Sequence, residues 1–224
     1  MNIVNFKSRT AKAKYLIFSF LIFNFALFLS ACASFDAGGN VQRGRFALLR
    51  GDSKLALDHF QRASEIDSNY VMHIGPMKEG VWTYVGRAHY ASGDFKSAQK
   101  ALELARTRHP DDSFAPLYLG LALSKDGDRQ RGVKELHAGL TGLNDWLEYI
   151  DQYTIDRAYW DPGAIIRSGI KKEIAHINGK EINWAELIAS AERVGVDLET
   201  EADEARREKR REQRDSAKGD DKGK

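Results

Sequence analysis

The chain has 224 residues, of which 42% are hydrophobic and 29% charged, and its 34 basic and 32 acidic residues leave a formal net charge of +2. This length suffices for one helical domain with short extensions. A nearly neutral chain lacks the basic field on which nucleic-acid binding depends, so nucleic acid is excluded as a partner.

The N-terminal segment has the pattern of a secretory signal. Four basic residues between Lys7 and Lys14 precede an apolar run from Leu16 to Leu29 that only Ser19 and Asn24 interrupt. A helix of this length spans about 21 Å, which is short of the bilayer's hydrocarbon core of about 30 Å. We therefore expect residues 1–31 to be a signal peptide rather than a permanent transmembrane helix.

The single cysteine, Cys32, closes the sequence Leu29-Ser30-Ala31-Cys32 directly after this run. A core or disulfide role is the alternative, but the chain has no second cysteine, and this position is poorly suited to a core. The order resembles the lipobox of bacterial lipoproteins, in which the thiol receives diacylglycerol, the chain is cut before the cysteine and the new amine is acylated. The resemblance implies a lipidated N-terminus and tether over residues 32–36, anchored by acyl chains such as palmitate.

Lipoprotein processing has two further implications for the mature chain. Its balance becomes 30 basic against 32 acidic residues, because the signal contains four basic residues and no acidic one. By the same resemblance, Ala33 and Ser34 in place of an aspartate imply an outer-membrane protein that faces the periplasm. We therefore expect a lipid-anchored protein of the cell envelope.

A Gly-Asp pair recurs in the middle of the chain, at Gly51, Gly93 and Gly127, and each pair follows another glycine by seven residues. The earlier glycines are Gly44, Gly86 and Gly120. The second and third copies are 34 residues apart, a period that is typical of the tetratricopeptide repeat with its two antiparallel helices. In such a hairpin Gly86 and Ala98 allow the two helices to approach closely, Gly93 ends the first helix, Asp94 caps the second and Pro110 ends it.

The middle copy, residues 79–112, resembles the tetratricopeptide consensus most closely. The matching positions are Trp82, Val85, Gly86, His89, Ala98, Leu102, Ala105 and Pro110. The copies at 37–70 and 113–146 match less well, and the third has Gly132 and Gly139 where the family has alanine. The resemblance implies an all-α solenoid of about three helical hairpins over residues 37–146. The extra residues between the first two copies, 71–78, contain Gly75-Pro76 and are expected to form an irregular link.

Helical periodicity continues past the repeats, over residues 147–198. The spacing predicts a helix from Trp146 to Tyr153, a second over Ile166 to Ile177 capped by Asp161, and a third from Trp184 capped by Asn183 with Glu186. These helices are expected to cover the open end of the array. Residues 199–224, with nine acidic and nine basic residues, are predicted to be a charged tail that is partly disordered, with a helix continuing to about Arg214.

The region also contains a cluster of aromatic residues, for which core packing and a second interface are both open. The cluster comprises Trp146, Tyr149, Tyr153, Tyr159 and Trp160.

The sequence contains no spacing of catalytic, metal-binding or nucleotide-binding residues that exceeds chance, so we predict no enzymatic activity, no metal and no cofactor. The family resemblance implies a concave groove formed by the first helix of each repeat. Its expected partner-binding residues are Arg45, Thr83, Tyr84, Arg87, Tyr90, Tyr118 and Ser124. Arg45 and Arg87 share one repeat position and are expected on an accessible surface, either as a strip that binds an acidic peptide or simply as solvated helix surface.

The predicted function is that of a periplasmic adaptor that binds an envelope protein or peptide in this groove and assists the assembly of an envelope complex. The alternative is a structural lipoprotein whose repeats stack into a homo-oligomer.

Overall fold

The computed structural model describes the backbone of residues 36–221 and the side chains of residues 36–215. The predicted signal peptide and Cys32 lie outside the described residues, so their roles stay predictions. Within 36–221, no helix combines the length and the apolar character that crossing a bilayer requires.

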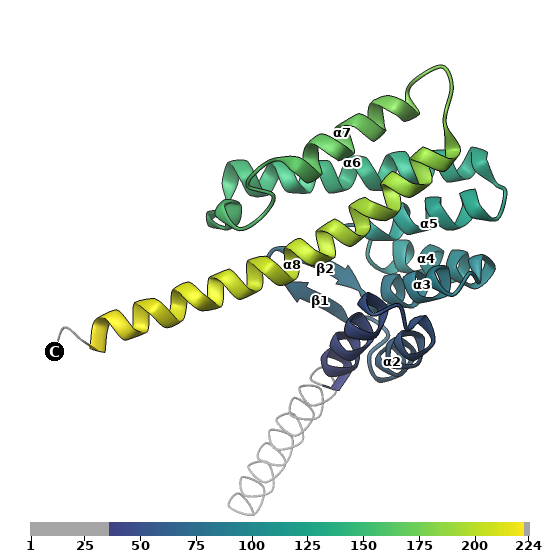
Figure 1. The fold of residues 1–224 in the computed structure, drawn as a ribbon. Helices are drawn as coiled ribbons and strands as arrows, with labels where there is room; N and C mark the ends of the chain where they lie inside the picture. The colour runs from purple at the N-terminus through teal and green to yellow at the C-terminus, as the bar shows by residue number, and fades with distance from the viewer. Residues whose placement is uncertain (1–35, 222–224) are drawn as a thin grey trace, which may run out of the picture.

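The fold is mostly helical, as predicted, and begins with three successive helical hairpins (Figure 1). Residues 36–49 form the first helix. The elements that follow are α2 (Ser53–Ile66), β1 (Val71–Ile74), β2 (Met77–Gly80), α3 (Val81–Ala91), α4 (Phe95–Arg108), α5 (Phe114–Lys125) and α6 (Arg129–Tyr153). The chain ends with the short 3₁₀ helix η1 (Ile155–Ala158), α7 (Ile165–Ile177) and α8 (Trp184–Asp221).

The three Gly-Asp pairs make the same turn in each hairpin. Gly51, Gly93 and Gly127 have φ angles of 79°, 79° and 100°, a conformation that favours glycine because it has no Cβ. The aspartate that follows each of them accepts a hydrogen bond from the backbone N–H three residues later, at 3.0 to 3.1 Å. The pair therefore ends one helix and caps the next, as the sequence predicts.

The earlier glycines lie where the two helices of each hairpin touch. A Cβ added to Gly44 would lie 2.4 Å from the Phe60 ring, and one added to Gly86 would lie 2.4 Å from Leu102. At Gly120 the nearest atom would be backbone, the amide nitrogen of Leu136 at 2.5 Å. The partner follows its glycine by 16 residues in every hairpin, so the sequence repeat corresponds to a repeat in packing.

The third hairpin packs more closely than the other two. A Cβ on Gly139 would lie 2.4 Å from the backbone nitrogen of Leu117, and one on Gly132 would lie 2.3 Å from Oγ of Ser124. Glycine replaces alanine at these two positions because α5 and α6 approach each other too closely to leave room for a methyl group. The replacement therefore does not weaken the repeat.

The link over residues 71–78 is an antiparallel β-hairpin rather than the irregular segment expected. Ile74 pairs with Met77 around the turn at Gly75-Pro76, where Gly75 has a φ of 57°. Because side chains alternate between the two faces of a strand, Met77 and Glu79 point to the same, buried side. Both link methionines, Met72 and Met77, lie in the core.

Two predicted boundaries are wrong at the C-terminal side. The helix expected to start near Trp146 is the last part of α6, which runs without a break from Arg129. The region expected to end at residue 198 does not end there: α8 runs from Trp184 to Asp221, somewhat beyond the helix end expected near Arg214, so residues 199–221 are not a separate tail. Ala202 and Ala205 explain this second difference, since they extend the buried face of α8 beyond its last large apolar residue.

The predicted caps of α7 and α8 are present. Asp161 accepts hydrogen bonds from the backbone nitrogens of Ile166 and Arg167, at 2.9 and 3.0 Å. Asn183 accepts one from the backbone nitrogen of Glu186 at 3.3 Å. α7 packs along α6, and α8 then packs on α7 and α5.

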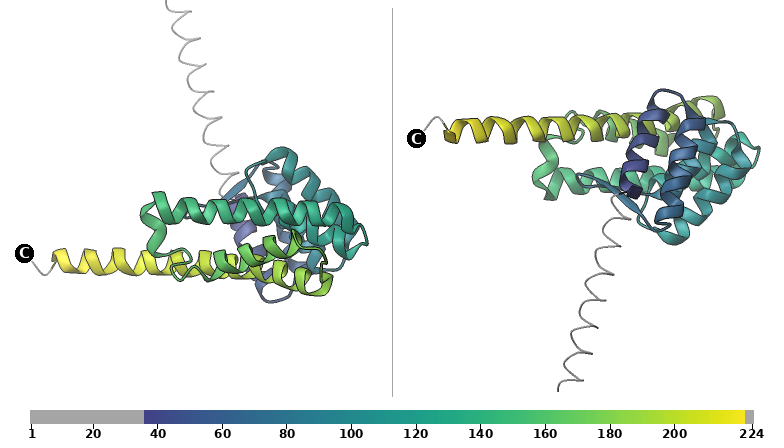
Figure 2. Two further views of the ribbon diagram at one scale, coloured as in Figure 1. Left: turned by 90° about the horizontal axis from the view of Figure 1, so that it is seen from above. Right: turned by 90° about the horizontal axis from the view of Figure 1, so that it is seen from below.

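The hydrophobic core is continuous through these elements. Its buried side chains run from Ala37, at the start of the first helix, to Ala205 in α8. All residues of the described core thus lie after Cys32 in the sequence. A chain that begins at Ala33 therefore keeps the whole of this core. The distal end of α8 projects clear of the hairpins, as both views in Figure 2 show.

Candidate functional site

The groove formed by the first helix of each hairpin is occupied by α8. This helix crosses residues 36–49, α3 and α5 (Figure 1), and it contacts all three through polar side chains. The expectation of an open, accessible groove is wrong for this structure, because the C-terminal helix covers it. The region of α8 around Glu199 therefore decides what the groove residues do.

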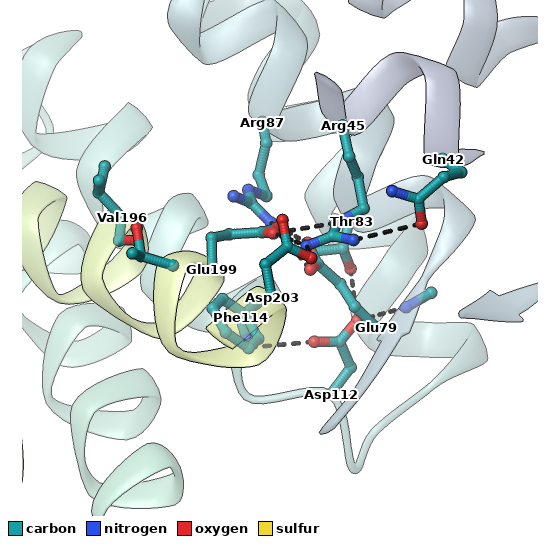
Figure 3. Close-up of polar contacts among 12 residues, drawn as sticks. Gln42, Arg45, Glu79, Thr83, Arg87, Asp112, Phe114, Val196, Glu199 and Asp203 are labelled. Atoms are coloured by element: carbon teal, nitrogen blue, oxygen red, sulfur yellow. Dashed lines mark hydrogen bonds and ion pairs between the residues drawn. The ribbon is translucent and has the colours of Figure 1, made fainter. Parts of the chain in front are cut away.

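Glu199 bridges the two arginines that were expected to bind a partner (Figure 3). Its Oε2 accepts hydrogen bonds from Arg45, including one from Nε at 2.9 Å, and its Oε1 lies 2.5 Å from Nη1 of Arg87. Arg45 is 1% exposed and Glu199 is 2% exposed. A carboxylate between two guanidinium groups is the arrangement expected for an acidic peptide, and here the chain itself supplies the carboxylate.

Glu79 holds the other side of Arg87. Nη1 of Arg87 lies 2.7 and 2.8 Å from the two carboxylate oxygens of Glu79, which is fully buried. The strand β2 delivers this carboxylate, because Glu79 lies two residues after the buried Met77. We refer to Arg45, Glu79, Arg87 and Glu199 as the charge cluster.

Two further carboxylates border the charge cluster. Asp203 lies one helical turn after Glu199, and its Oδ1 is 3.4 Å from Nη2 of Arg45. Asp112 is buried beside Thr83, whose hydroxyl donates to it at 2.7 Å, and it also accepts from the backbone nitrogens of Gly80 and Phe114. Asp112 thus fastens the loop before α5 to the start of α3.

Aromatic rings lie close to the guanidinium group of Arg87. Its guanidinium carbon lies 4.8 Å from the ring centre of Tyr118 and 5.5 Å from that of Tyr84. Among the described residues, neither Nε of Arg87 nor the hydroxyl of Tyr84 has a hydrogen-bond partner, although both atoms are buried. Cation–π contacts therefore replace part of the hydrogen bonding that Arg87 has lost by burial.

The two glutamates of the charge cluster have opposite titration behaviour. Burial raises the pKa of Glu79 to about 8, and the nearby Arg87 offsets only part of that effect. Burial acts on Glu199 in the same direction, but Arg87 and Arg45 together hold the pKa of Glu199 below its ordinary value. The difference arises because Glu199 contacts two arginines, whereas Glu79 contacts one and lies near Glu199 and Asp112.

These shifts predict that the protein is most stable in mildly acidic solution. A carboxyl whose pKa is higher in the folded than in the unfolded state binds its proton more tightly when folded. The contribution of Glu79 to stability is therefore complete below about pH 4.5, and it is lost progressively as the pH rises to about 8. The pKa shift of Glu199 has the opposite sign, so its contribution to stability is lost as the pH falls below about 4.5. Urea unfolding between pH 5 and pH 8 should show a decline of at most about 1.4 kcal/mol per pH unit.

The control is Glu79→Gln, which keeps the shape of the side chain and cannot ionise. This variant should flatten the decline while leaving the loss below pH 4.5 in place, since that loss belongs to Glu199. An equally steep decline in the variant would show that other groups cause it.

The remaining groove residues are also covered. Thr83 and Tyr84 are fully buried, Tyr118 and Ser124 are nearly so, and Tyr90 is partly buried with its hydroxyl on Glu192 of α8. Ser124 bonds the backbone oxygen of Gly120 at 2.7 Å, within its own helix. The structure therefore brings these residues together as predicted, but it places them in the interior, and their role toward a partner stays a prediction.

The aromatic cluster divides into a buried and an exposed part. Trp146 and Trp160 pack edge to face with their ring centres 5.1 Å apart, and Tyr159 is partly buried against the core. Tyr149 and Tyr153 are 58% and 73% exposed, and their rings lie 5.6 Å apart on the surface of α6. Core packing therefore applies to Trp146 and Trp160, and an interface role for the exposed tyrosines stays a prediction.

Sequence reasoning missed Glu79 and Glu199, and each had a signal. For Glu79 the signal was Gly75-Pro76 flanked by alternating apolar and polar residues, Met72-His73-Ile74 before it and Met77-Lys78 after it, a pattern typical of a hairpin. For Glu199 it was the continuation of the apolar spacing of α8 through Ala202 and Ala205.

Within residues 36–215, no group of three histidine, cysteine, aspartate or glutamate side chains is placed to hold a metal ion. Comparison of the chain with family models, with curated proteins and with solved structures gave no match.

Proposed function

We propose that this chain is a lipid-anchored adaptor of the cell envelope, in which three hairpins of tetratricopeptide type form a platform for another envelope protein. The lipobox ending at Cys32 supports the anchor, and Ala33 and Ser34 support a place on the outer membrane, facing the periplasm. The repeated helix–Gly-Asp–helix packing supports the repeat type.

The occupied groove favours a platform over a peptide-binding groove. A peptide that entered the groove would have to displace α8, which buries Leu187 and Leu198. It would also leave Arg45 and Arg87 without Glu199, and breaking a buried ion pair costs about 3–5 kcal/mol. We therefore assign α8 a permanent place in the groove and propose that the partner binds the outer surface.

The observation that carries the proposal is a group of exposed apolar side chains where α6 ends. Tyr149, Tyr153 and Ile155, which we call the distal patch, are 58%, 73% and 87% exposed. Ile165, at the start of the neighbouring α7, is 77% exposed. Tyrosines and branched aliphatic side chains that protrude together are typical of protein-binding surfaces, since their burial in a complex supplies most of its free energy.

The distal patch can be tested by affinity capture. The variant Tyr149→Ser/Tyr153→Ser/Ile155→Ser should lose an envelope protein that the unchanged chain retains after crosslinking and solubilisation in detergent. Because the three side chains are exposed, their replacement should change the free energy of unfolding by no more than about 0.5 kcal/mol each. Mass spectrometry of the captured proteins is the measurement.

The matched control is Leu55→Ser/Ile66→Ser, which removes exposed apolar side chains from α2 instead. It should retain the protein that the patch variant loses. Capture of the same proteins by the patch variant and by the unchanged chain would contradict the assignment of the patch.

A second copy of the chain is the other partner that the same surface suits, because tyrosines that pack on each other in one chain can pack across a two-fold axis. In that case only the chain itself would be captured. Sedimentation would then show a dimer that the patch variant loses and the α2 variant keeps.

A further inference from the structure

In the distal half of α8, basic and acidic side chains lie mainly on different sides of the helix. On the side toward the first helix, five arginines share a cleft of about 310 Å³ with Gln42, Phe46 and one carboxylate, Asp203, which lies near Arg45. We call them the arginine stripe: Arg206, Arg207, Arg210, Arg211 and Arg214. The side toward α7 is mainly acidic and borders another cleft, whose charged lining is Asp161, Asp197, Glu201, Glu204 and Glu208, with Arg207 and Arg211 at its edge. The sequence spacing explains most of this separation, since residues four apart share one face of a helix: Arg206, Arg210 and Arg214 follow one another on one face, and Glu204 and Glu208 on another.

The arginine stripe is not neutralised within the part of the chain whose side chains are described. Through residue 215, none of its guanidinium groups forms an ion pair, and Arg206 contacts only the amide oxygen of Gln42, at 3.4 Å. Lys209, on another side of the helix, is paired with Asp156 at 2.8 Å. Arg207, Arg210, Arg211 and Arg214 are exposed. These four cations are therefore available to an anionic partner.

The position of the stripe indicates which partner. It borders Gln42 and Phe46 on the first helix, and Gln42 lies only about 9 Å along that helix from residue 36. Cys32 precedes residue 36 by four residues, and a chain of that length reaches at most about 15 Å. We propose that the arginine stripe binds the phosphate groups of anionic phospholipids in the membrane that holds the lipid of Cys32. This inference rests on the anchor in the proposed function.

Arginine and phosphate have matching chemistry. The planar guanidinium group donates two parallel hydrogen bonds to phosphate oxygens and is weakly hydrated, so it loses little by leaving water. The covalent anchor would hold the stripe near the headgroups, which raises their effective concentration around it. The exposed Phe46 lies in the same cleft and can enter the headgroup region beside the arginines.

A second copy of α8 fits the stripe less well. Pairing two such helices would bring the arginine side of one against the acidic side of the other. However, from Glu199 to Asp215 the apolar residues of α8 are Ala202 and Ala205, and both are already buried in this chain. The interface would desolvate charges without burying apolar surface, which seldom gives net stability. A bilayer surface leaves the arginines partly hydrated and avoids that penalty.

Vesicle binding tests the inference with the chain that begins at Ala33, which keeps the whole described core. It should co-sediment with vesicles of phosphatidylcholine and phosphatidylglycerol at about 0.1 M salt, and lose this binding at about 1 M salt, where the screening length falls to about 3 Å. Vesicles of phosphatidylcholine alone should not bind it. The variant Arg207→Glu/Arg211→Glu/Arg214→Glu should lower the partition coefficient at least about 100-fold, since each arginine near an anionic surface contributes roughly a factor of five.

The matched control is Lys54→Glu/Lys100→Glu/Lys134→Glu, which makes the same change in net charge at exposed positions of the second helices, α2, α4 and α6. It should bind as the unchanged chain does. Equal losses in both variants would overturn the inference, because the binding would then follow net charge alone. A chain that ignores anionic vesicles but sediments as a dimer sensitive to the arginine variant would overturn it in favour of a second copy.

The anchor is tested separately, in cells that make the full chain. Cys32→Ala should leave unprocessed precursor outside the outer-membrane fraction. Normal fractionation of this variant would refute the anchor, whereas absence of vesicle binding by the chain from Ala33 would refute the arginine stripe.

Discussion

Glu199→Ala should be among the most destabilising single substitutions in this protein, with a loss of about 3–5 kcal/mol in the free energy of unfolding. The substitution removes the only carboxylate that contacts both Arg45 and Arg87 among the described residues, and leaves two buried guanidinium groups without it. Glu79 remains for Arg87, but Arg45 would keep only Asp203 at 3.4 Å and the amide of Gln42. Urea unfolding monitored by circular dichroism is the measurement.

Two further variants separate the charge cluster from a general effect on α8. Glu199→Gln keeps the shape of the side chain and one hydrogen-bond acceptor but loses the charge and the second acceptor, so its loss should be smaller than that of the alanine variant. Glu204→Ala changes an exposed glutamate on the same helix and should stay within about 0.5 kcal/mol of the unchanged chain. If Glu199→Ala unfolds at the same urea concentration as Glu204→Ala, the charge cluster contributes nothing to stability.

Hydrogen exchange would show how the stability is lost in Glu199→Ala. The amides between Leu187 and Ala205 should exchange faster than those of α3 and α4, because the charge cluster fastens α8 to hairpins that are also held by their own apolar contacts. Uniform acceleration along the chain would instead mean that α8 and the hairpins unfold together.

Gly120→Ala is expected to be the second large effect, with a loss of about 1–3 kcal/mol. The added Cβ would lie 2.5 Å from the backbone nitrogen of Leu136 and 2.8 Å from the backbone oxygen of Gly132, so relief requires α5 and α6 to move apart. At Gly86 the same atom would meet the side chain of Leu102, which can change its rotamer. Gly86→Ala should therefore cost less than Gly120→Ala.

The control for this prediction is Gly169→Ala in α7, where a Cβ would meet nothing within 4 Å. This variant should gain about 0.5–1 kcal/mol, because alanine is the better helix former and no packing opposes it. Thermal unfolding of the three glycine variants gives their order directly. A neutral Gly120→Ala would contradict the close approach of α5 and α6.

The local structure of the hairpins was predictable because it depends on residues close together in sequence. The turn at Gly93-Asp94 needs a positive φ followed by a capping side chain, and both requirements are met within two residues. The close approach of the helices at Gly86 was likewise predicted, from the small residues Gly86 and Ala98, and the side chain that Gly86 meets is that of Leu102. The caps at Asp161 and Asn183 belong to the same class of short-range signal.

Predictions that depended on an element's surroundings were less successful. The β-hairpin at Gly75-Pro76 is short, and the sequence pattern of two four-residue strands is weak. The packing of α8 beyond Leu198 was missed because only large apolar residues were counted, whereas alanines suffice where a helix lies close against its neighbour.

The sequence by itself determined a mostly helical chain with three repeated hairpins, and predicted a lipobox ahead of them. It also indicated that Arg45 and Arg87 share one side of the array and suit a carboxylate. Only the tertiary structure decided that this carboxylate is Glu199, which lies 154 residues after Arg45 along the chain. Local patterns contain no information about which distant helix will enter a groove, because that choice depends on the summed burial and charge pairing of the whole of α8.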